Sequence, residues 1–155
     1  MSENELDHQQ HMTEVIAFKV NEDEYCVDIM SVREIRGWTP ATRIPHAPSF
    51  VRGVINLRGA VLPIIDLGAR FGFDQTETSE RNVIIVAQMD GQLFGLLVDA
   101  VSDIMTITGD DLQPTPNVGS ETARTFIKNV IAQEDQMIRF IDLKQILPQE
   151  MAQVA

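Results

Sequence analysis

The chain has 155 residues, of which 44% are hydrophobic and 23% charged, a composition typical of one globular domain or two small subdomains. Its formal net charge of −11 disfavours nucleic acid and anionic lipid surfaces as partners, because both repel an acidic protein. We therefore expect proteins or small molecules as partners, no nucleic acid and no direct insertion into a membrane.

The two ends of the chain lack a hydrophobic period. We expect residues 1–13 to form a disordered N-terminal tail, residues 14–148 to form the folded domain, and residues 149–155 to form a C-terminal tail. The N-terminal stretch has neither the basic start nor the apolar middle of a signal peptide. Cys26 is the only cysteine and has no partner for an internal disulfide, so we interpret it as a small buried hydrophobe in a cytoplasmic protein.

Short apolar runs between turn signals predict a mainly β domain. Two brief segments, residues 67–71 and 142–147, have the spacing of single helical turns, and no long amphipathic helix is indicated. The predicted strands are VIAFKV (15–20), YCVDI (25–29), FVRGVINL (50–57), AVLPIIDL (60–67), VIIVAQM (83–89), LFGLLVDAV (93–101), FIKNVIA (126–132) and MIRFIDL (137–143).

The chain also contains a weak internal repeat. Residues 15–35 align without gaps on residues 84–104, a shift of 69 that places Tyr25 on Phe94. Residues 53–67 align on residues 129–143 with a shift of 76, so the second copy has a longer connection, expected in DLQPTPNVGSE (111–121). Because closure into a barrel removes sheet edges, we interpret the chain as two similar β-units of about five strands each.

Arg58 and Gly59 separate two apolar strands by two residues, which is the spacing of a β-hairpin, and Gly59 can adopt a positive φ. The repeat places Glu134 and Asp135 at the same positions in the second copy. A charged side chain at a hairpin tip reaches water at little cost. Because the two copies carry opposite charges there, the fold alone does not explain why residue 58 is an arginine.

Positive charge gathers between residues 33 and 70. This segment has six arginines, no lysine and two carboxylates, which gives it a net charge of +4 in a chain of −11. Either the arginines scatter over different faces or they form an interface directed at a protein partner, since arginine is enriched in protein interfaces. Trp38 is either a lid on the core or an exposed anchor. The six are Arg33, Arg36, Arg43, Arg52, Arg58 and Arg70.

Motifs of catalysis and metal binding are missing. The chain has no nucleophile elbow, phosphate-binding loop, dinucleotide fingerprint or zinc-protease motif. Its three histidines, His8, His11 and His46, provide little for a catalytic triad or a metal site. Asp66 and Asp142 each stand at a predicted strand-to-helix junction, where helix capping is the expected role. We expect no enzymatic activity, no metal and no cofactor.

Three stretches of the chain form a recognisable pattern: DEYCVDIMSVREIRGW (23–38), TRIPHAPSFVRGVINLRGAVLPIIDL (42–67) and LFGLLVDAVSDIMTI (93–107). They resemble the CheW family of bacterial chemotaxis coupling proteins, and the resemblance extends from about Val15 to Leu147. It implies two SH3-like five-stranded β-barrel subdomains that share an apolar core, with the N-terminal strand completing the second. It also implies a non-enzymatic adaptor that bridges the cytoplasmic hairpin tip of methyl-accepting chemoreceptors to the regulatory domain of the histidine kinase CheA in membrane-bound arrays.

The resemblance also assigns receptor-binding positions. They are Val32, Glu34 and Ile35 in V-x-E-I, and Gly53, Arg58 and Gly59 in G-V-x-N-L-R-G. No motif is sharp enough to assign kinase-binding residues. Gln113 and Val118 stand where some relatives have arginine and phenylalanine in contacts between coupling proteins, which leaves weak self-association in arrays open.

We hypothesise that Glu34 and Arg58 face each other across the groove between the two units, with Val32 and Ile35 as an apolar floor. Their opposite charges and their positions in the two family motifs motivate this hypothesis. Two alternatives remain for the function. One is a coupling protein of another chemosensory pathway, such as twitching motility, and the other is a small-molecule-binding β-barrel or an undetected hydrolase.

Overall fold

The computed structural model describes residues 12–116, 121–133 and 135–147, which form two β-sheets. The five-stranded sheet has the order β3 (Val32–Gly37), β6 (Val83–Met89), β7 (Gln92–Val98), β5 (Ala60–Asp66) and β4 (Val51–Leu57). The six-stranded sheet has the order β8 (Ala100–Thr108), β1 (Met12–Val20), β2 (Asp23–Asp28), β11 (Gln136–Ile141), β10 (Ile127–Gln133) and β9 (Leu112–Gln113). Short helical segments join them: η1 (Ile29–Ser31), α2 (Leu67–Arg70), η2 (Gly109–Asp111), α3 (Glu121–Phe126) and α4 (Leu143–Ile146).

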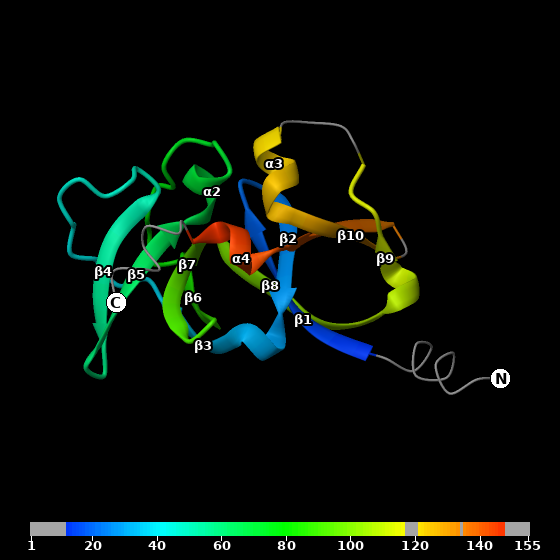
Figure 1. Ribbon diagram of the computed structural model, residues 1–155, viewed down its shortest axis with the longest axis horizontal. Helices are drawn as coiled ribbons and strands as arrows, with labels where there is room; N and C mark the ends of the chain where they lie inside the picture. The colour runs from blue at the N-terminus through cyan, green and yellow to red at the C-terminus, as the bar shows by residue number, and fades with distance from the viewer. Residues whose placement is uncertain (1–11, 117–120, 134, 148–155) are drawn as a thin grey trace.

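The two sheets form two lobes that lie side by side (Figure 1). The first barrel contains β3 to β7, and the second barrel contains β1, β2 and β8 to β11; α4 lies between them in Figure 1. The predicted fold class is confirmed: the chain is mainly β, with two barrel subdomains, a shared apolar core and short helical turns. The sixth strand of the second barrel is β9, which has two residues.

Each barrel borrows a hairpin from the other copy of the repeat. The hairpin β1–β2 belongs to the first copy in sequence, yet it pairs with β8 and β11 of the second copy. Conversely, β6–β7 pairs with β3 and β5 of the first copy. The parallel strand pairs β2–β11 and β7–β5 have the same register in the two barrels. Cys26 pairs with Phe140 in one, and their repeat counterparts, Gly95 (69 residues later) and Ile64 (76 residues earlier), pair in the other. The repeat seen in the sequence is therefore confirmed as a structural repeat with exchanged hairpins.

The β-bulges of the two barrels also coincide. The register between β4 and β5 shifts at Arg52, and the register between β10 and β11 shifts at Lys128, 76 residues later. A bulge adds one residue to one strand and turns its side chain away from the regular alternation. These matched irregularities indicate that the two copies share backbone detail as well as strand order.

The exchanged hairpins are apolar on both faces because each separates two cores. In β6, Ile84 and Val86 face the interior of the first barrel, while Ile85 and Ala87 face the core shared by the two barrels. In β2, Cys26 faces the interior of the second barrel. Since successive residues of a strand point to opposite faces, a strand covered on both sides reads as a continuous apolar run. This burial explains why these strands were predicted correctly.

Arg70 joins the two copies where they meet. Its guanidinium stacks over the rings of Phe50 and Phe126, 4.3 and 4.7 Å from their centroids. Its Nε also donates to the carbonyl oxygen of Ile146 at 2.8 Å. The 76-residue shift relates Phe50 to Phe126 and Arg70 to Ile146, so Arg70 contacts a repeat-related pair of rings and its own counterpart in the second copy. Burial lowers the pKa of Arg70 from its ordinary value, and we infer a structural role for this arginine.

Two sequence expectations need correction. Met12 and Thr13 are not in a tail, because β1 starts at Met12 and pairs these residues with Thr108 and Ile107. Strand β3 and most of β8 were not predicted as strands, because both are edge strands with charged or polar residues at alternate positions. Residues 1–11 and 149–155, where the rest of the two tails was expected, and residue 148, expected at the end of the folded domain, lie outside the described residues.

Candidate interaction site

The tip of the β4–β5 hairpin is a two-residue turn. Leu57 pairs with Ala60, and the side chain of Asn56 accepts a hydrogen bond from the backbone N–H of Gly59 at 2.9 Å. Gly59 has a φ of 90°, which confirms the predicted hairpin and the predicted role of its glycine. Arg58 also has a positive φ, 52°. Positive values at both central residues are the pattern of a type I′ turn.

This turn does not favour arginine. A side chain other than glycine in the left-handed region costs roughly 1 kcal/mol or more, and asparagine, aspartate and glycine are the residues that type I′ turns prefer. The Arg58 side chain is 72% exposed, so burial does not offset that cost. Arg58 therefore occupies a position that the backbone alone would give to another residue.

The Arg58 guanidinium is oriented by Glu34. Its Nη2 donates a hydrogen bond to Oε1 of Glu34, and Nη1 of Arg36 lies 3.5 Å from the other carboxylate oxygen. The hydrogen bond from Arg58 lowers the pKa of Glu34, with further lowering from the charges of Arg58 and Arg36. Two arginines share one carboxylate, so this cluster keeps one net positive charge. Because Arg58 is exposed and Glu34 and Arg36 are only partly buried, we expect these ion pairs to contribute little to folding.

The hypothesis paired the correct residues but placed them wrongly. Strands β3 and β4 are the two edges of the five-stranded sheet, so Glu34 and Arg58 meet where the first barrel closes on itself. They do not face each other across the groove between the two units. Both strands belong to the first copy of the repeat, and the exchanged hairpin β6–β7 lies between β3 and β5 in their sheet.

Val32 and Ile35 do not form a floor beneath the pair. In the antiparallel pairing of β3 with β6, Glu34 lies opposite Val86, which faces the interior of the first barrel, while Ile35 lies opposite Ile85 on the other face. Val32 is half-buried against the shared core, and Ile35 is 43% exposed. Edge strand β3 therefore presents an apolar side chain on one face and a charged cluster on the other.

Gly53 has a structural reason to be glycine. Its φ is 138°, and a Cβ atom at this position would lie 2.3 Å from the carbonyl oxygen of Thr42. Thr42 is held there by two backbone hydrogen bonds with Val54, at 2.9 and 2.8 Å. Gly53 is itself buried, so its tight packing accounts for the residue type without any partner. Its assignment to receptor binding remains a prediction.

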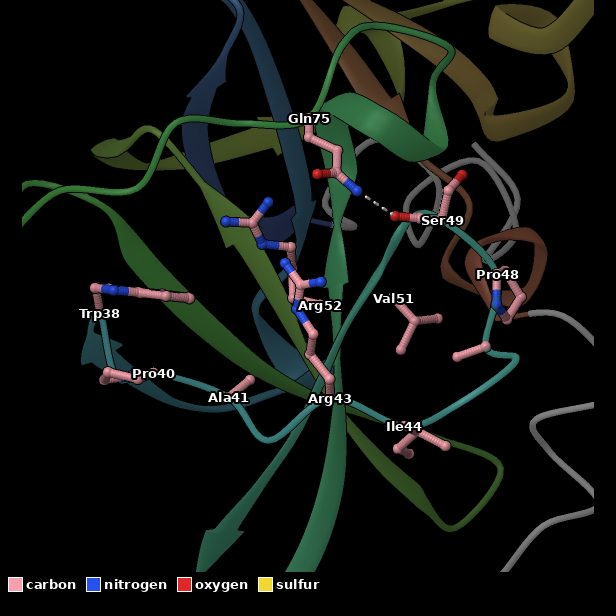
Figure 2. Close-up of a pocket in the computed structure, with 11 residues that line it drawn as sticks. Trp38, Pro40, Ala41, Arg43, Ile44, Pro48, Ser49, Val51, Arg52 and Gln75 are labelled. Carbon is pink, nitrogen blue, oxygen red and sulfur yellow. Dashed lines mark hydrogen bonds between the residues drawn. The ribbon is translucent and has the colours of Figure 1, made fainter.

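The six arginines of residues 33–70 do not share one surface. Arg36 and Arg58 pair with Glu34 where the edges β3 and β4 meet, a place we call the mouth of the first barrel, and Arg70 lies between the two copies. Arg33 donates a hydrogen bond to the side chain of Gln88 at 2.6 Å. Arg43 and Arg52 line a hollow beside β4, and Trp38 forms part of its wall (Figure 2). Trp38 is half-buried against the interior of the first barrel, so it is both a packing residue and an accessible one.

The remaining candidate residues have structural environments. Asp66 and Asp142 cap α2 and α4 by accepting backbone hydrogen bonds from Ala69 and Lys144, as predicted. Burial raises the pKa of the Cys26 thiol to about 12, so it is protonated at neutral pH. Within the described residues, no group of three His, Cys, Asp or Glu side chains could hold a metal ion. No helix in that part of the chain is long and apolar enough to cross a membrane.

Comparisons with known proteins agree on one family. The family model described as "CheW-like domain" matches residues 14–151. "Chemotaxis protein CheW" of Rhizobium meliloti (strain 1021) is 55% identical over 142 residues, which cover 92% of each chain. The protein of the same name from Klebsiella aerogenes is 35% identical over 88% of this chain and 82% of its own length. A crystal structure of the scaffolding protein TtCheW from Thermoanaerobacter tengcongensis matches with a TM-score of 0.78 and 34% identity, covering 85% of this chain and 90% of that one.

Proposed function

The chain belongs to the CheW-like family, and from this premise we propose that it couples the cytoplasmic tips of chemoreceptors to the histidine kinase CheA. Proteins of this family are non-enzymatic scaffolds in chemotaxis signalling. The names of the matched relatives favour chemotaxis over another chemosensory pathway or a small-molecule-binding barrel. The proposed location is the cytoplasm, at receptor arrays.

The observation that carries the proposal is the conformation of Arg58. The residue is exposed, held by Glu34 in one orientation, and placed in a turn position that disfavours arginine. An arginine fixed before binding loses less conformational entropy when it meets a partner. Only Nη2 bonds to Glu34 among the described contacts, so the other N–H groups of Arg58 can donate to carbonyl or carboxylate oxygens of a receptor helix.

The predicted receptor-binding residues require a partner that wraps around the edge strand β3. Arg58 and Glu34 lie at the mouth of the first barrel, whereas Ile35 lies on the opposite face of β3. Because β3 is an edge strand, a receptor helix that approaches along the edge can contact both faces. In this arrangement Arg58 provides directional hydrogen bonds and Ile35 provides apolar contact, while Val32, Gly53 and Gly59 hold the backbone that presents them.

Co-sedimentation tests the proposal. Membranes that contain a chemoreceptor are mixed with CheA, with and without this chain, and the pelleted proteins are quantified. We expect this chain to pellet with the receptor membranes and to increase the amount of CheA in the pellet. Membranes without receptor serve as the control. If the chain pellets equally with those membranes, or if CheA binding does not depend on it, the proposed coupling function is wrong.

A further inference from the structure

A hollow of about 340 Å³ lies between the loop of residues 38–49 and strand β4, on the first barrel. The loop is anchored by the backbone hydrogen bonds between Thr42 and Val54, and Gln75 Nε2 donates to the carbonyl oxygen of Ser49 at 3.0 Å. Figure 2 shows Trp38 and Pro48 on opposite sides of the hollow, with the side chains of Arg43 and Arg52 between them. The hollow is thus a formed feature of the first barrel.

The hollow has two guanidinium groups and no carboxylate in its lining. Among the described residues, Arg43 has no hydrogen bond, ion pair or ring partner. Arg52 forms a long ion pair with Asp66, in which Nη1 lies 3.8 Å from Oδ2, a separation beyond hydrogen-bond distance. Asp66 is fully buried and already accepts hydrogen bonds from the backbone of Ala69 and from the backbone and hydroxyl of Thr76. Among the described contacts, no hydrogen bond occupies the guanidinium of either arginine, so both can donate to a ligand while Arg52 remains paired in charge with Asp66.

The second barrel offers a direct contrast. Arg52 is the extra residue of the β4 bulge, and its counterpart Lys128 is the extra residue of the β10 bulge. Lys128 stacks over the ring of Phe140, 4.2 Å from the centroid, whereas Arg52 points into the hollow. Another hollow, of about 390 Å³, lies on the second barrel and includes a carboxylate, Asp23, in its lining. Both hollows are lined by two arginines, Arg124 and Arg139 in the second, but among the described residues only the second of these two hollows has a carboxylate in its lining.

From this geometry we propose that the hollow binds an acidic segment of a partner protein, whose carboxylate is held by Arg43 and Arg52 and whose neighbouring apolar side chain packs on Trp38. A guanidinium pairs with a carboxylate through two parallel hydrogen bonds, which gives both charge and direction. The volume exceeds that of a single ion and lies in the range of ligand pockets. Arg43, Ile44 and Ser49 are exposed at its rim, so an extended peptide can enter from the surface.

This binding site is separate from the proposed receptor site. Arg52 and Arg58 are six residues apart on an extended strand, which corresponds to roughly 20 Å. A partner could therefore occupy the hollow while the hairpin tip remains available. The proposal does not depend on the coupling function, and a failure of either one leaves the other intact.

Trp38 provides the measurement, because it is the only tryptophan in the chain and it lines the hollow. The intact protein is titrated with the peptide acetyl-Leu-Glu-Glu-amide while Trp38 fluorescence is recorded. Acetyl-Leu-Gln-Gln-amide and inorganic phosphate are titrated in parallel. We expect a saturable change with the Glu peptide and at least tenfold weaker binding of the Gln peptide and of phosphate. Raising the salt concentration should weaken the binding of the Glu peptide.

Two single substitutions test whether the Glu peptide binds in the hollow. Arg43→Gln should weaken the Glu peptide about tenfold, and Arg81→Gln, which removes the same charge from an exposed position outside the hollow, should change it less than twofold. Circular dichroism confirms that each variant is folded. Equal binding of the Glu and Gln peptides, equal effects of the two substitutions, or phosphate binding as tight as that of the Glu peptide would each overturn the proposal.

Discussion

The tips of the β4–β5 and β10–β11 hairpins differ in charge although the hairpins themselves match. Both hairpins contain a bulge at the same position and present an exposed apolar side chain just beyond the turn, Val61 in the first and Met137 in the second. The first tip carries Arg58, and the repeat places Glu134, which lies outside the described residues, at the same position in the second. The shared features belong to the fold, so partner recognition is to be sought where the copies differ.

The largest expected effect comes from a position where the two barrels differ in packing. Gly53→Ala forces a Cβ atom against the carbonyl of Thr42 and strains the backbone, so we expect a loss of about 3 kcal/mol or more in the free energy of unfolding. In a domain of this size that loss lowers the Tm by about 6–12 °C. Thermal unfolding followed by circular dichroism measures it.

Asn129 is the control, because it follows the β10 bulge as Gly53 follows the β4 bulge and it already has a side chain. Asn129→Ala removes its hydrogen bond to the carbonyl of Gln113 and should cost about 1 kcal/mol or less. If Gly53→Ala instead leaves the Tm unchanged and abolishes receptor binding, Gly53 is a contact residue and its structural explanation fails.

The next effect concerns the junction of the two copies. Arg70→Met removes hydrogen bonds to the carbonyls of Gln145 and Ile146, and it removes the stacking of the guanidinium on the rings of Phe50 and Phe126. We therefore expect a loss of about 2–3 kcal/mol in the free energy of unfolding. Urea unfolding measures this loss. Arg81→Met, at an exposed position, should change the free energy by less than about 0.5 kcal/mol. Similar values for the two variants would contradict the role of Arg70 as the junction.

The smallest effect is a shift in the titration of one carboxylate. The folded-state pKa of Glu34 lies below its ordinary value of 4.5, so its stabilising contribution is present above that value and is lost as the pH falls through the folded pKa. Arg58→Asn removes the main cause, and the pKa of Glu34 should rise toward 4.5. Carbon NMR of the side-chain carboxyl groups measures the change.

Asp111 of the second barrel is the internal reference for this titration. Its pKa is lowered chiefly by the backbone N–H of Thr108, which Arg58 does not contact. The pKa of Asp111 should therefore be the same in the unmodified protein and in Arg58→Asn. If both carboxylates shift together, or if neither does, the pairing of Glu34 with Arg58 does not exist in solution.

Much of the fold could be predicted because burial leaves a direct trace in the sequence. Strands such as β6 and β7 lie between two cores and read as unbroken apolar runs. Strand β3 escaped prediction because it lies at an edge, where Arg33, Glu34 and Arg36 interrupt the apolar pattern. The repeat alignment did not reveal the exchange of hairpins, since it is the same whichever copy supplies the partner strand. The family resemblance did imply that the N-terminal strand completes the second barrel, and β1 pairs with β8 there.

The candidate site was predictable in part for similar reasons. Opposite charges in two family motifs sufficed to pair Glu34 with Arg58, but the sequence did not show that β3 and β4 are the two edges of one sheet, which is what brings the pair together. The need for glycine at Gly53 arises from Thr42, whose contact with β4 exists only in three dimensions. The excess of arginine in residues 33–70 was visible in the sequence, but the meeting of Arg43 and Arg52 beside Trp38 was not.

The central claim is that Arg58 serves a partner and not the turn, and Arg58→Asn tests it most directly. Asparagine suits a type I′ turn, so the Tm should stay the same or rise slightly, while the affinity for receptor membranes should fall about thirtyfold, as for a loss of about 2 kcal/mol at an interface. Asp135→Asn, at the tip of the other hairpin, should leave that affinity unchanged. Unaltered receptor affinity in Arg58→Asn, or a lowered Tm, would contradict the claim.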